Sequence, residues 1–597
     1  MMSPPVRRPA RSGPAESGGV ALVIALLVMG ILLLLGVAFL SLSATEVQIA
    51  TNERQADQAF FVAEAGLTQA VRDLLYDLNV KQTGGATPSW IYNADPSRAS
   101  SRTLNGPPGL EWDERSRRLV QRPAIALDLT QGGAAAPAPP QYLDRARTRG
   151  GKVDWFAQPW VRISYAGTAI GSVSQGTIGS YTVDLLNEPG LPARVYVRAT
   201  GQTAVGQARV VLRAELEAAN LSPWNTAAYS GGPLNGGNPV SGNLTIRGSV
   251  YFRGSAALGG GTHIYNNYSD GTGVAAPDPL IVEKLPPLPG GNLQGAVRVR
   301  GDLSLADSSS IGLPENAADS VKQTMQGVYV TGGTTAPGGA IHADRVGTRV
   351  PDVPPPSLLD YHSRLDAREG TTRVQDAAGT TEAERAMSLY REDAGTAVLD
   401  DATADALGIG KKEGGCFWIR ESTPSFTLGT SGNRLIYDRT AAQLTFDGGG
   451  PRGEGVLVFV DGCLRIGLPG TLQYSNRGTL VVNGDVRLEG ERDGGALYAS
   501  GTYPSPHSLG LIARSDITFE GSPGSRMLGA FFAGGQVRVQ RQVKLGGAVV
   551  AVSNIRLEQV ADLYQVPALV ANLPPGMPGG KARWTLAAFN WQEMREQ

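Results

Sequence analysis

The sequence predicts an α+β protein in which a long N-terminal helix, first transmembrane and then amphipathic, packs on an antiparallel sheet and carries a large β-solenoid. Three observations predict this fold. An apolar run without a charged residue between Glu16 and Glu46 leads directly into a helix-periodic segment. Short alternating runs fill 159–218, and a ten-residue strand, corner and strand pattern recurs seven times after about residue 242.

The apolar run is long enough to cross a membrane. From Val20 to Leu42, at about 1.5 Å per residue, a single helix covers a bilayer core of about 30 Å. Arginines precede the run and acidic residues follow it, which places the N-terminus in the cytoplasm and exports the chain after about residue 45. These residues are Arg7, Arg8 and Arg11 before the run, and Glu46, Glu53, Asp57 and Glu64 after it.

The helix is predicted to continue beyond the membrane, over 20–81. Apolar residues recur there in steps of three and four, the spacing of one helical face. They are Phe60, Ala63, Leu67, Ala70, Leu74 and Leu78. A cleaved secretory signal is the alternative, but it normally has an apolar core of about 7–15 residues followed by a break, and no break is present here.

Two stretches resemble the N-terminal region of PilX-type minor pilins: Gly19-Val-Ala-Leu-Val-Ile-Ala-Leu-Leu27 and Asn52-Glu-Arg-Gln-Ala-Asp-Gln-Ala-Phe-Phe-Val-Ala-Glu-Ala-Gly-Leu67. The resemblance implies that residues 1–19 are a leader that a prepilin peptidase removes between Gly19 and Val20, with Gly18 as an alternative site. It also implies that the mature chain leaves the inner membrane to join other minor and major pilins.

The fifth mature position departs from ordinary pilins, which resemble one another in having Glu there. In this chain the residue is Ile24. In a pilus that carboxylate is thought to neutralise the amino terminus of a neighbouring subunit, because an unpaired charge in an apolar bundle costs several kcal/mol. PilX-like and secretion-system K-type minor pilins share this lack, which implies a place at or near the fibre tip. The alternative is that Ile24 is only a membrane-compatible residue.

Length and composition limit the remaining part of the chain. A length of 597 residues predicts several domains, and 78 Gly, 39 Pro and 18% charged residues favour β-rich, turn-rich architecture. With 53 basic and 54 acidic residues the net charge is −1. Overall charge therefore gives no reason to expect nucleic-acid binding, which would need a local patch.

The predicted domains follow one another along the chain. Residues 82–158 form an irregular linker, and 159–229 an antiparallel sheet in which the turn-like Gly201-Gln-Thr-Ala-Val205 separates two strands. Residues 230–573 form the solenoid, with a polar, partly helical insertion at about 351–412. Residues 574–597 form a linker and a strand that could rejoin the 159–229 sheet, which would make the solenoid an insertion within that domain.

The solenoid prediction depends on a repeat with the same corner in each copy, Gly or Ser followed by Asp, Asn, Gln, Ser or Cys. A short unit that turns a corner and cannot bury its apolar face alone is typical of a stacked β-solenoid; a sandwich or irregular β structure is the alternative. The copies are 244–253, 297–306, 458–467, 480–489, 511–520, 531–540 and 549–558.

Both cysteines, Cys416 and Cys463, align with the same corner of the repeat. An even pair in an exported protein suggests a disulfide. Forty-seven residues separate them, nearly two turns, and turns two apart would lie about 10 Å apart, beyond the roughly 7 Å Cα limit, unless the segment Ser425–Leu444 bulges out. A disulfide and two buried thiols therefore both stay open.

No catalytic or metal-binding pattern is present in the sequence. The four histidines, His263, His342, His362 and His507, lie far apart, and no Gly-x-Ser-x-Gly or phosphate-binding loop occurs. We therefore expect no enzyme activity, no metal and no cofactor.

One surface pattern indicates ligand binding. The eighth position of the repeat points away from the core, and in the last five copies it is basic except at Thr518. Such a row could follow a phosphate backbone. The candidate DNA-binding residues are Arg465, Arg487, Arg538, Arg541, Lys544 and Arg556. The alternative is a solvated ladder, because Glu489, Glu520 and Glu558 lie two positions on and could pair with the arginines.

The combination of a PilX-like start and a large solenoid is similar to the DNA-uptake minor pilins of type IV pili. This similarity implies a non-enzymatic subunit at the pilus tip or cell surface that helps to initiate pilus assembly and binds extracellular double-stranded DNA. A tip adhesin for a surface, a polysaccharide or another cell is the main alternative. A membrane-anchored, carbohydrate-active β-helix enzyme is a third.

Overall fold

The structure of the protein is a computed structural model. It describes residues 18–76, 102–103, 110–113, 118–121, 126–127, 162–170, 177–187, 194–204, 208–240, 242–269, 276–288, 292–314, 323–360, 378–412, 414–450, 453–468, 470–490, 495–522, 524–558, 561–579 and 584–595. Most of the predicted leader, Leu78 and most of the predicted linker 82–158 lie outside these residues. Two small antiparallel pairs fall within that linker: β1 (Arg102–Thr103) with β4 (Ala126–Leu127), and β2 (Leu110–Asp113) with β3 (Arg118–Gln121).

The N-terminal helix α1 (Gly18–Tyr76) is continuous over 59 residues, as its uninterrupted periodicity predicts. Its apolar first part is exposed on every side and is long and apolar enough to cross a membrane. From Ala59 onward one face is buried. The predicted residues Ala63, Leu67, Ala70 and Leu74 lie on this face, whereas Phe60 is half-buried.

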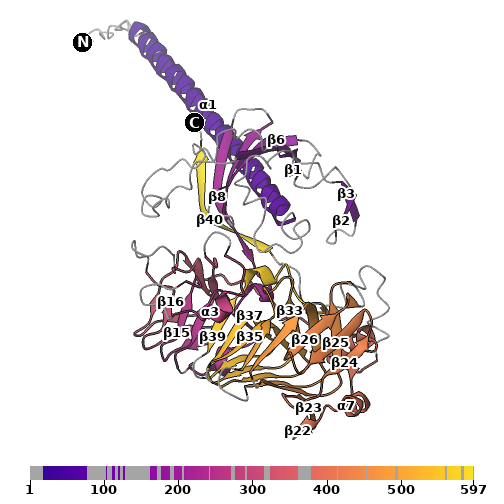
Figure 1. The fold of residues 1–597 in the computed structure, drawn as a ribbon. Coiled ribbons are helices and arrows are strands. Elements are labelled where there is room, and N and C mark those ends of the chain that lie inside the picture. Colours follow the sequence, from indigo (N-terminus) through magenta and orange to yellow (C-terminus); the bar gives the residue numbers. More distant parts are fainter. Residues whose placement is uncertain are drawn as a thin grey trace, which may run out of the picture.

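Helix α1 packs on a five-stranded antiparallel sheet with the order β40-β8-β7-β6-β5. The strands are β5 (Arg162–Ile170), β6 (Thr177–Asn187), β7 (Arg194–Thr203), β8 (Arg209–Asn220) and β40 (Trp584–Arg595). Strand β40 pairs with β8, so the chain between these two strands is an excursion from one sheet (Figure 1).

The prediction of a turn beginning at Gly201 is wrong, because β7 continues through this residue to Thr203. A Cβ atom at Gly201 would lie 2.3 Å from the Ala59 carbonyl oxygen of α1. The glycine is therefore needed for the close approach of helix and sheet rather than for a turn.

The excursion forms a large, mostly parallel β domain with one apolar core, whose strands are described here in three sets. The first set contains β9 (Ala228–Ser230), β11 (Val250–Phe252), β14 (Ala296–Val299), β17 (Gly327–Val330), β20 (Val346–Gly347), β21 (Val398–Leu399), β27 (Val456–Val460), β30 (Arg477–Val482), β33 (Ser508–Ala513), β35 (Ser525–Ala533) and β37 (Val543–Ala551).

The second set belongs to the same 21-stranded sheet as the first. It contains β10 (Thr245–Arg247), β13 (His263–Tyr265), β16 (Ser310–Ile311), β19 (Ala340–Ile341), β24 (Phe426–Thr430), β25 (Asn433–Asp438), β26 (Gln443–Asp447), β29 (Thr471–Ser475), β32 (Ala496–Ala499) and β39 (Asp562–Gln565).

The third set forms two separate sheets. A three-stranded sheet contains β12 (Ala256–Leu258), β15 (Leu303–Leu305) and β18 (Thr334–Thr335). A seven-stranded sheet, here named the distal sheet, contains β22 (Lys411–Lys412), β23 (Cys416–Ile419), β28 (Leu464–Leu468), β31 (Val486–Gly490), β34 (Ile517–Glu520), β36 (Val537–Gln540) and β38 (Ile555–Leu557). Short helices join the strands: η5 (Pro223–Asn225), η6 (Leu234–Gly237), α3 (Pro279–Val282), α6 (Glu382–Ala394), α7 (Asp401–Leu407) and η9 (Pro567–Leu569).

The chain enters this domain in the middle of the stack. Strand β9 lies between β37 and β11, with Ala228 paired to both Val549 and Val250. Strand β10 likewise pairs with β39, so early and late copies of the repeat meet at this seam. The early copies extend from the seam in one direction and the late copies in the other, and the two halves share one core.

The register confirms the alignment of the five late copies. Val458, Leu480, Leu511, Phe531 and Val549 occupy one continuous row, all at most 3% exposed. The sequence alignment of the early copy 244–253 is wrong by one strand. It matched Leu244 with Val297 of the next copy, whereas in the structure Val250 pairs with Val297. The domain has several corners, and Gly248-Ser249 at one corner resembles Gly254-Ser255 at the next.

The repeated corner residue is explained by a hydrogen-bond ladder. Asp485 Oδ1 accepts a bond of 3.2 Å from the backbone N–H of Asp516, whose own Oδ1 accepts a bond of 2.7 Å from the N–H of Gln536. Asp302 does the same for Gly333 at the other end of the stack. The Asp carboxylate thus accepts a hydrogen bond from a backbone N–H of the next turn. This N–H lies at a corner, where it has no partner within a strand.

The far end of the stack is closed by β24, β25 and β26, which pair antiparallel, and by helices α6 and α7. Helix α6 begins at a capping box of Thr381 and Glu384, in which hydrogen bonds to the carboxylate lower the pKa of Glu384 to about 2. Both helices lie within the insertion at about 351–412 that was predicted to be partly helical, and residues 361–377 of this insertion lie outside the described residues. Strand β21, also inside the predicted insertion, pairs with β27 and belongs to the main sheet.

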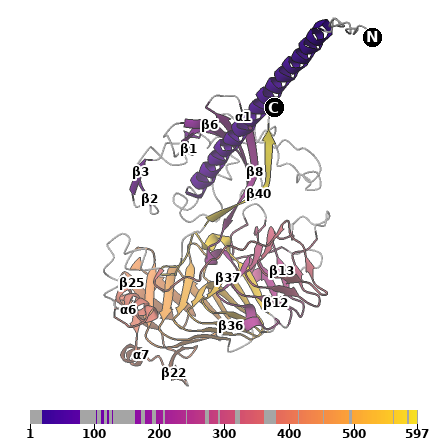
Figure 2. The ribbon, with the colours of Figure 1, turned by 180° about the vertical axis from the view of Figure 1, so that it is seen from behind.

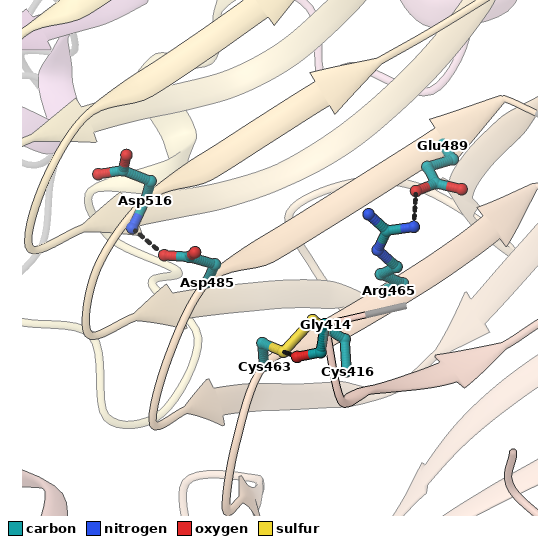
Figure 3. The surroundings of a disulfide bond; sticks show 7 residues. All are labelled: Gly414, Cys416, Cys463, Arg465, Asp485, Glu489 and Asp516. Carbon is teal, nitrogen blue, oxygen red and sulfur yellow. Dashed lines mark hydrogen bonds and ion pairs between the residues drawn. A yellow bond between two sulfur atoms is a disulfide. The ribbon is translucent and has the colours of Figure 1, made fainter. Parts of the chain in front are cut away.

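The two cysteines form a disulfide at this closed end, with a Cα–Cα distance of 4.6 Å (Figure 3). Strands β23 and β28 are direct parallel neighbours. The 46 residues between the cysteines therefore connect directly neighbouring strands, and the antiparallel strands β24 to β26 lengthen this connection. The sequence allowed a disulfide if the segment Ser425–Leu444 bulged out, and strands β24 to β26 cover most of that segment.

Polar contacts hold the β domain against the α1 sheet where the chain crosses between them. The fully buried Trp224 donates a hydrogen bond of 2.7 Å from Nε1 to the Pro578 carbonyl oxygen. This bond joins the segment that follows β8 to the segment that precedes β40. Arg345, next to β20, forms an ion pair with Glu215 of β8.

Removal of one ladder acceptor should destabilise the stack. Asp516→Ala leaves the Gln536 N–H without its acceptor, and we expect the free energy of unfolding to fall by about 1 kcal/mol. Asp516→Asn keeps an oxygen in place and should have a smaller effect. Denaturant midpoints of the two variants measure the difference, and equal midpoints would contradict the ladder.

Loss of the disulfide should have a larger effect. Closure of a 47-residue loop by a cross-link is expected to contribute about 4 kcal/mol through the unfolded state. Cys416→Ala/Cys463→Ala should melt at a lower temperature than the oxidised protein. Reductant should shift the melting temperature of the wild type but not that of the double variant.

Candidate functional site

The distal sheet lies on the side of the β domain away from α1. In Figure 1, β22 and β23 lie at the end farthest from the helix, and Figure 2 shows β22 and β36 along the same border from behind. The other faces carry segments of this chain. Tyr229 and Tyr251 donate hydrogen bonds to carbonyls of the segment 351–353, and Ile281 of α3 lies over Gly546.

The predicted basic row exists in register across the distal sheet. Arg465 pairs with Arg487, Arg487 with Thr518, Thr518 with Arg538, and Arg538 with Arg556. Each side chain is partly exposed between two buried apolar neighbours on its strand, because successive strand residues point to opposite faces. Neighbouring strands are about 4.8 Å apart, so the arginines form one column.

The half of the row near the disulfide is neutralised. Glu489 Oε1 lies 3.2 Å from Arg465 Nη1 (Figure 3). Its Oε2 accepts a bond of 2.9 Å from Lys412. Arg465 and Glu489 are only 12% and 14% exposed, and Arg487 lies 3.7 Å from Glu520. Arg465 and Arg487 therefore follow the predicted alternative, in which the arginines pair with glutamates of the neighbouring row.

The half of the row near the seam is different. Within the described residues, Arg538 and Arg556 have no ion pair, and the Nε atom of each is shielded from solvent without a hydrogen-bond partner. Two guanidinium groups at the same register on adjacent strands repel each other unless an anion lies between or above them. Arg538 and Arg556 thus form the part of the row that can accept an external anion.

Lys544 does not join this row, contrary to its proximity in the sequence. It lies on β37 in the other sheet, where Nζ is 2.9 Å from Asp278 Oδ2, an oxygen that also accepts a bond of 2.7 Å from Arg526. Burial raises the pKa of Asp278, but the hydrogen bonds and charges of Lys544 and Arg526 outweigh it and hold the pKa below its usual value. Lys544 is therefore part of a contact that holds the α3 segment on the stack.

Arg541 stays near the row. It follows β36 at the corner before β37, is exposed, and has a positive φ of 62°. With Arg538 and Arg556 it completes a basic group at the seam end of the distal sheet. No counter-ion for Arg541 is present among the residues with described positions.

Sequence reasoning missed two features of this surface. Trp418 continues the row beyond Arg465, with Arg420 at 4.2 Å and Lys412 at 4.6 Å from its ring centroid. Its alignment with Arg465 beside the cysteines was the signal that could have found it. The second feature is a set of amide side chains at the seam end: Gln536, Gln540, Asn554 and Asn235.

In the described part of the chain, no group of three or more His, Cys, Asp or Glu side chains is placed to hold a metal ion. The surface chemistry of the distal sheet is that of guanidinium, amide and carboxylate groups. Such a surface can bind an anion or a polar polymer.

Comparisons with known proteins agree with the reading of the N-terminus. Residues 18–68 match the family described as PilX N-terminal. A search of curated proteins finds no match. Among solved structures, the competence-associated pilin ComZ from Thermus thermophilus is similar, at 18% identity and a TM-score of 0.43, over 91% of this chain and 98% of that one.

Proposed function

We propose that the chain, whose residues 18–68 match the PilX N-terminal family, is a large minor pilin at or near the tip of a type IV pilus. Before assembly α1 anchors the protein in the inner membrane with its N-terminus in the cytoplasm, and the β domain lies outside. The exposed apolar part of α1 and the arginines before it support this orientation.

The tip position is supported by Ile24 and by the size of the β domain. Ile24 provides no carboxylate for a neighbour's amino terminus, so the subunit is poorly suited to repetition along a shaft. The protein would act at the start of a fibre, where it helps to initiate assembly and contacts other minor and major pilins. The β domain would then lie at the end of the fibre, with the distal sheet outermost.

We further propose that the β domain is a solenoid. The support is the parallel register of successive strands over both halves of the stack and the rows of buried residues inside it. The boundaries proposed from the sequence, 230–573 for the solenoid and 159–229 with 574–597 for the pilin sheet, are consistent with the pairing of β40 with β8. A rigid stack of this kind would hold a surface row in a fixed line.

The ligand we propose is extracellular double-stranded DNA, captured for natural transformation. The single observation that supports this proposal is the pair Arg538 and Arg556, which lacks counter-ions among the described residues on the sheet that faces away from the membrane helix. Phosphate contacts of this kind give salt-dependent affinity without sequence preference. The paired Arg465 and Arg487 would contribute little.

Arg538→Gln/Arg556→Gln should weaken DNA binding. We expect the full-length protein in non-ionic detergent to bind random duplex DNA more weakly as salt rises, and the double variant to lower the slope of log affinity against log salt by about two. Glutamine keeps most of the side-chain stem, so folding should be preserved.

The matched control is Arg349→Gln/Arg439→Gln, which removes the same charge from exposed positions outside the distal sheet. It should bind DNA like the wild type. Absence of wild-type DNA binding at low salt would contradict the DNA proposal and favour a tip adhesin. The uncharged row of Ala257, Ser304 and Thr335 on the three-stranded sheet would suit such an adhesin.

Processing offers a separate test of the pilin assignment. N-terminal sequencing of the protein from pili should begin at Val20, with Gly19 as the first residue if the cut follows Gly18. Gly18→Leu/Gly19→Leu should leave the leader attached and keep the protein in the inner membrane. A mature terminus beyond the apolar run would instead indicate a cleaved secretory signal.

A further inference from the structure

The two ends of the β domain are unlike. At the end that holds the disulfide, strands β24 to β26 and helices α6 and α7 cover the last turn. The distal sheet ends there at β22, which consists of Lys411 and Lys412. Lysine side chains on an edge strand oppose pairing with another chain. The closed end is therefore protected against association through its strands.

The opposite end, here named the open end, consists of β18, β19 and β20. Within the described residues each of these strands is paired on one side only, with β15, β16 and β17 of the preceding turn. The bonds to that turn use the residues on either side of Thr334, Ile341 and Val346; the N–H of Leu303, for example, donates to the Gly333 carbonyl at 2.9 Å. The backbone N–H and C=O groups of Thr334, Ile341 and Val346 therefore point outward. In the part of the chain that the structure describes, these outward groups have no hydrogen-bond partner.

The open end is also exposed and uncharged. Among the described residues of the β domain, Val346 is the most exposed large apolar side chain, at 69%. Residues 331–338 are all exposed, and no charged residue occurs from Thr331 to Ile341. Natural proteins cover or charge an unpaired sheet edge to prevent association. Among the described residues the open end has neither protection, which indicates that another chain pairs with it.

A second copy of this chain fits the open end. Because residues 331–341 carry no charge, two open ends can approach each other without repulsion between like charges. The closed end offers no matching edge, so copies cannot add head to tail into a filament. The remaining arrangement is open end against open end about a two-fold axis, which gives a closed dimer.

Such a dimer is compatible with anchoring in one membrane. Helix α1 and the distal sheet lie on opposite sides of the β domain (Figure 1). A two-fold axis that runs from one of these sides to the other keeps both α1 helices together on one side. The open end is held to the α1 sheet by the ion pair of Arg345 with Glu215, whose side chains are only 14% and 5% exposed.

We propose that two copies of this protein associate through the open ends of their β domains, by backbone pairing at Thr334, Ile341 and Val346. A strand perpendicular to the two-fold axis reverses its direction in the second copy, so the two copies meet as antiparallel strands. The dimer carries two distal sheets on one side. Its formation does not depend on the proposed DNA binding.

The test is the mass of the full-length protein in non-ionic detergent, measured by sedimentation equilibrium with the detergent density-matched. The wild type should change from monomer to dimer as its concentration rises. Thr334→Lys/Val346→Lys places like charges on both copies at the pairing edge, and should weaken dimerisation at least roughly tenfold. Both positions are exposed, so folding should be preserved, which the melting temperature checks.

The matched control is Thr427→Lys/Thr440→Lys, which adds the same charge at exposed positions near the closed end. It should dimerise like the wild type. Hydrogen exchange gives an independent measure, because pairing should slow the exchange of the Ile341 N–H in the wild type at high concentration but not in Thr334→Lys/Val346→Lys.

Three outcomes would overturn the inference. A wild type that stays monomeric at every concentration has no dimer, whether or not it binds DNA. Equal dimerisation of the wild type and Thr334→Lys/Val346→Lys would show that the copies associate through another surface, such as the apolar part of α1. Equal weakening by the two double variants would show an effect of net charge alone.

Discussion

The placement of β9 between β37 and β11 is the constraint on which the arrangement of the β domain depends. Strand β9 belongs to the first turn of the chain, and it pairs with β37 of the last turn on one side and with β11 of the second turn on the other. The two halves of the stack therefore share a core, and the segments that lead to β8 and β40 leave from the same place. Because these segments meet at Trp224 and Pro578, the β domain is held to the sheet under α1 by both of its ends.

The parallel register also explains why a surface row exists. Each turn places the same repeat position at the same height on the distal sheet, so a residue type that recurs in the sequence becomes a line in space. The corner ladder of Asp485 and Asp516 fixes this register from turn to turn. At the closed end a disulfide between Cys416 and Cys463 occupies the same corner position, where a covalent bond replaces the hydrogen bond.

Much of the fold could be predicted from periodicity, because periodicity reflects which side of an element is buried. The helical spacing of Ala63, Leu67, Ala70 and Leu74 and the alternation in the late copies both correspond to buried faces. Prediction failed where a local pattern has two structural explanations. Gly248-Ser249 and Gly254-Ser255 turn different corners, and Gly201 marks a close helix contact rather than a turn.

The sequence by itself determined the long apolar helix, the resemblance of its first part to PilX-type pilins, the repeat and the list of basic residues, since each of these depends on residues close together in the chain. Only the tertiary structure decided which charges remain available. Lys544 is three residues from Arg541 but across a corner, where Asp278, 266 positions away, neutralises it. Arg538 and Arg556 have no ion pair among the described residues. Charge neutralisation depends on distances of a few ångströms between turns, and a linear sequence does not contain those distances.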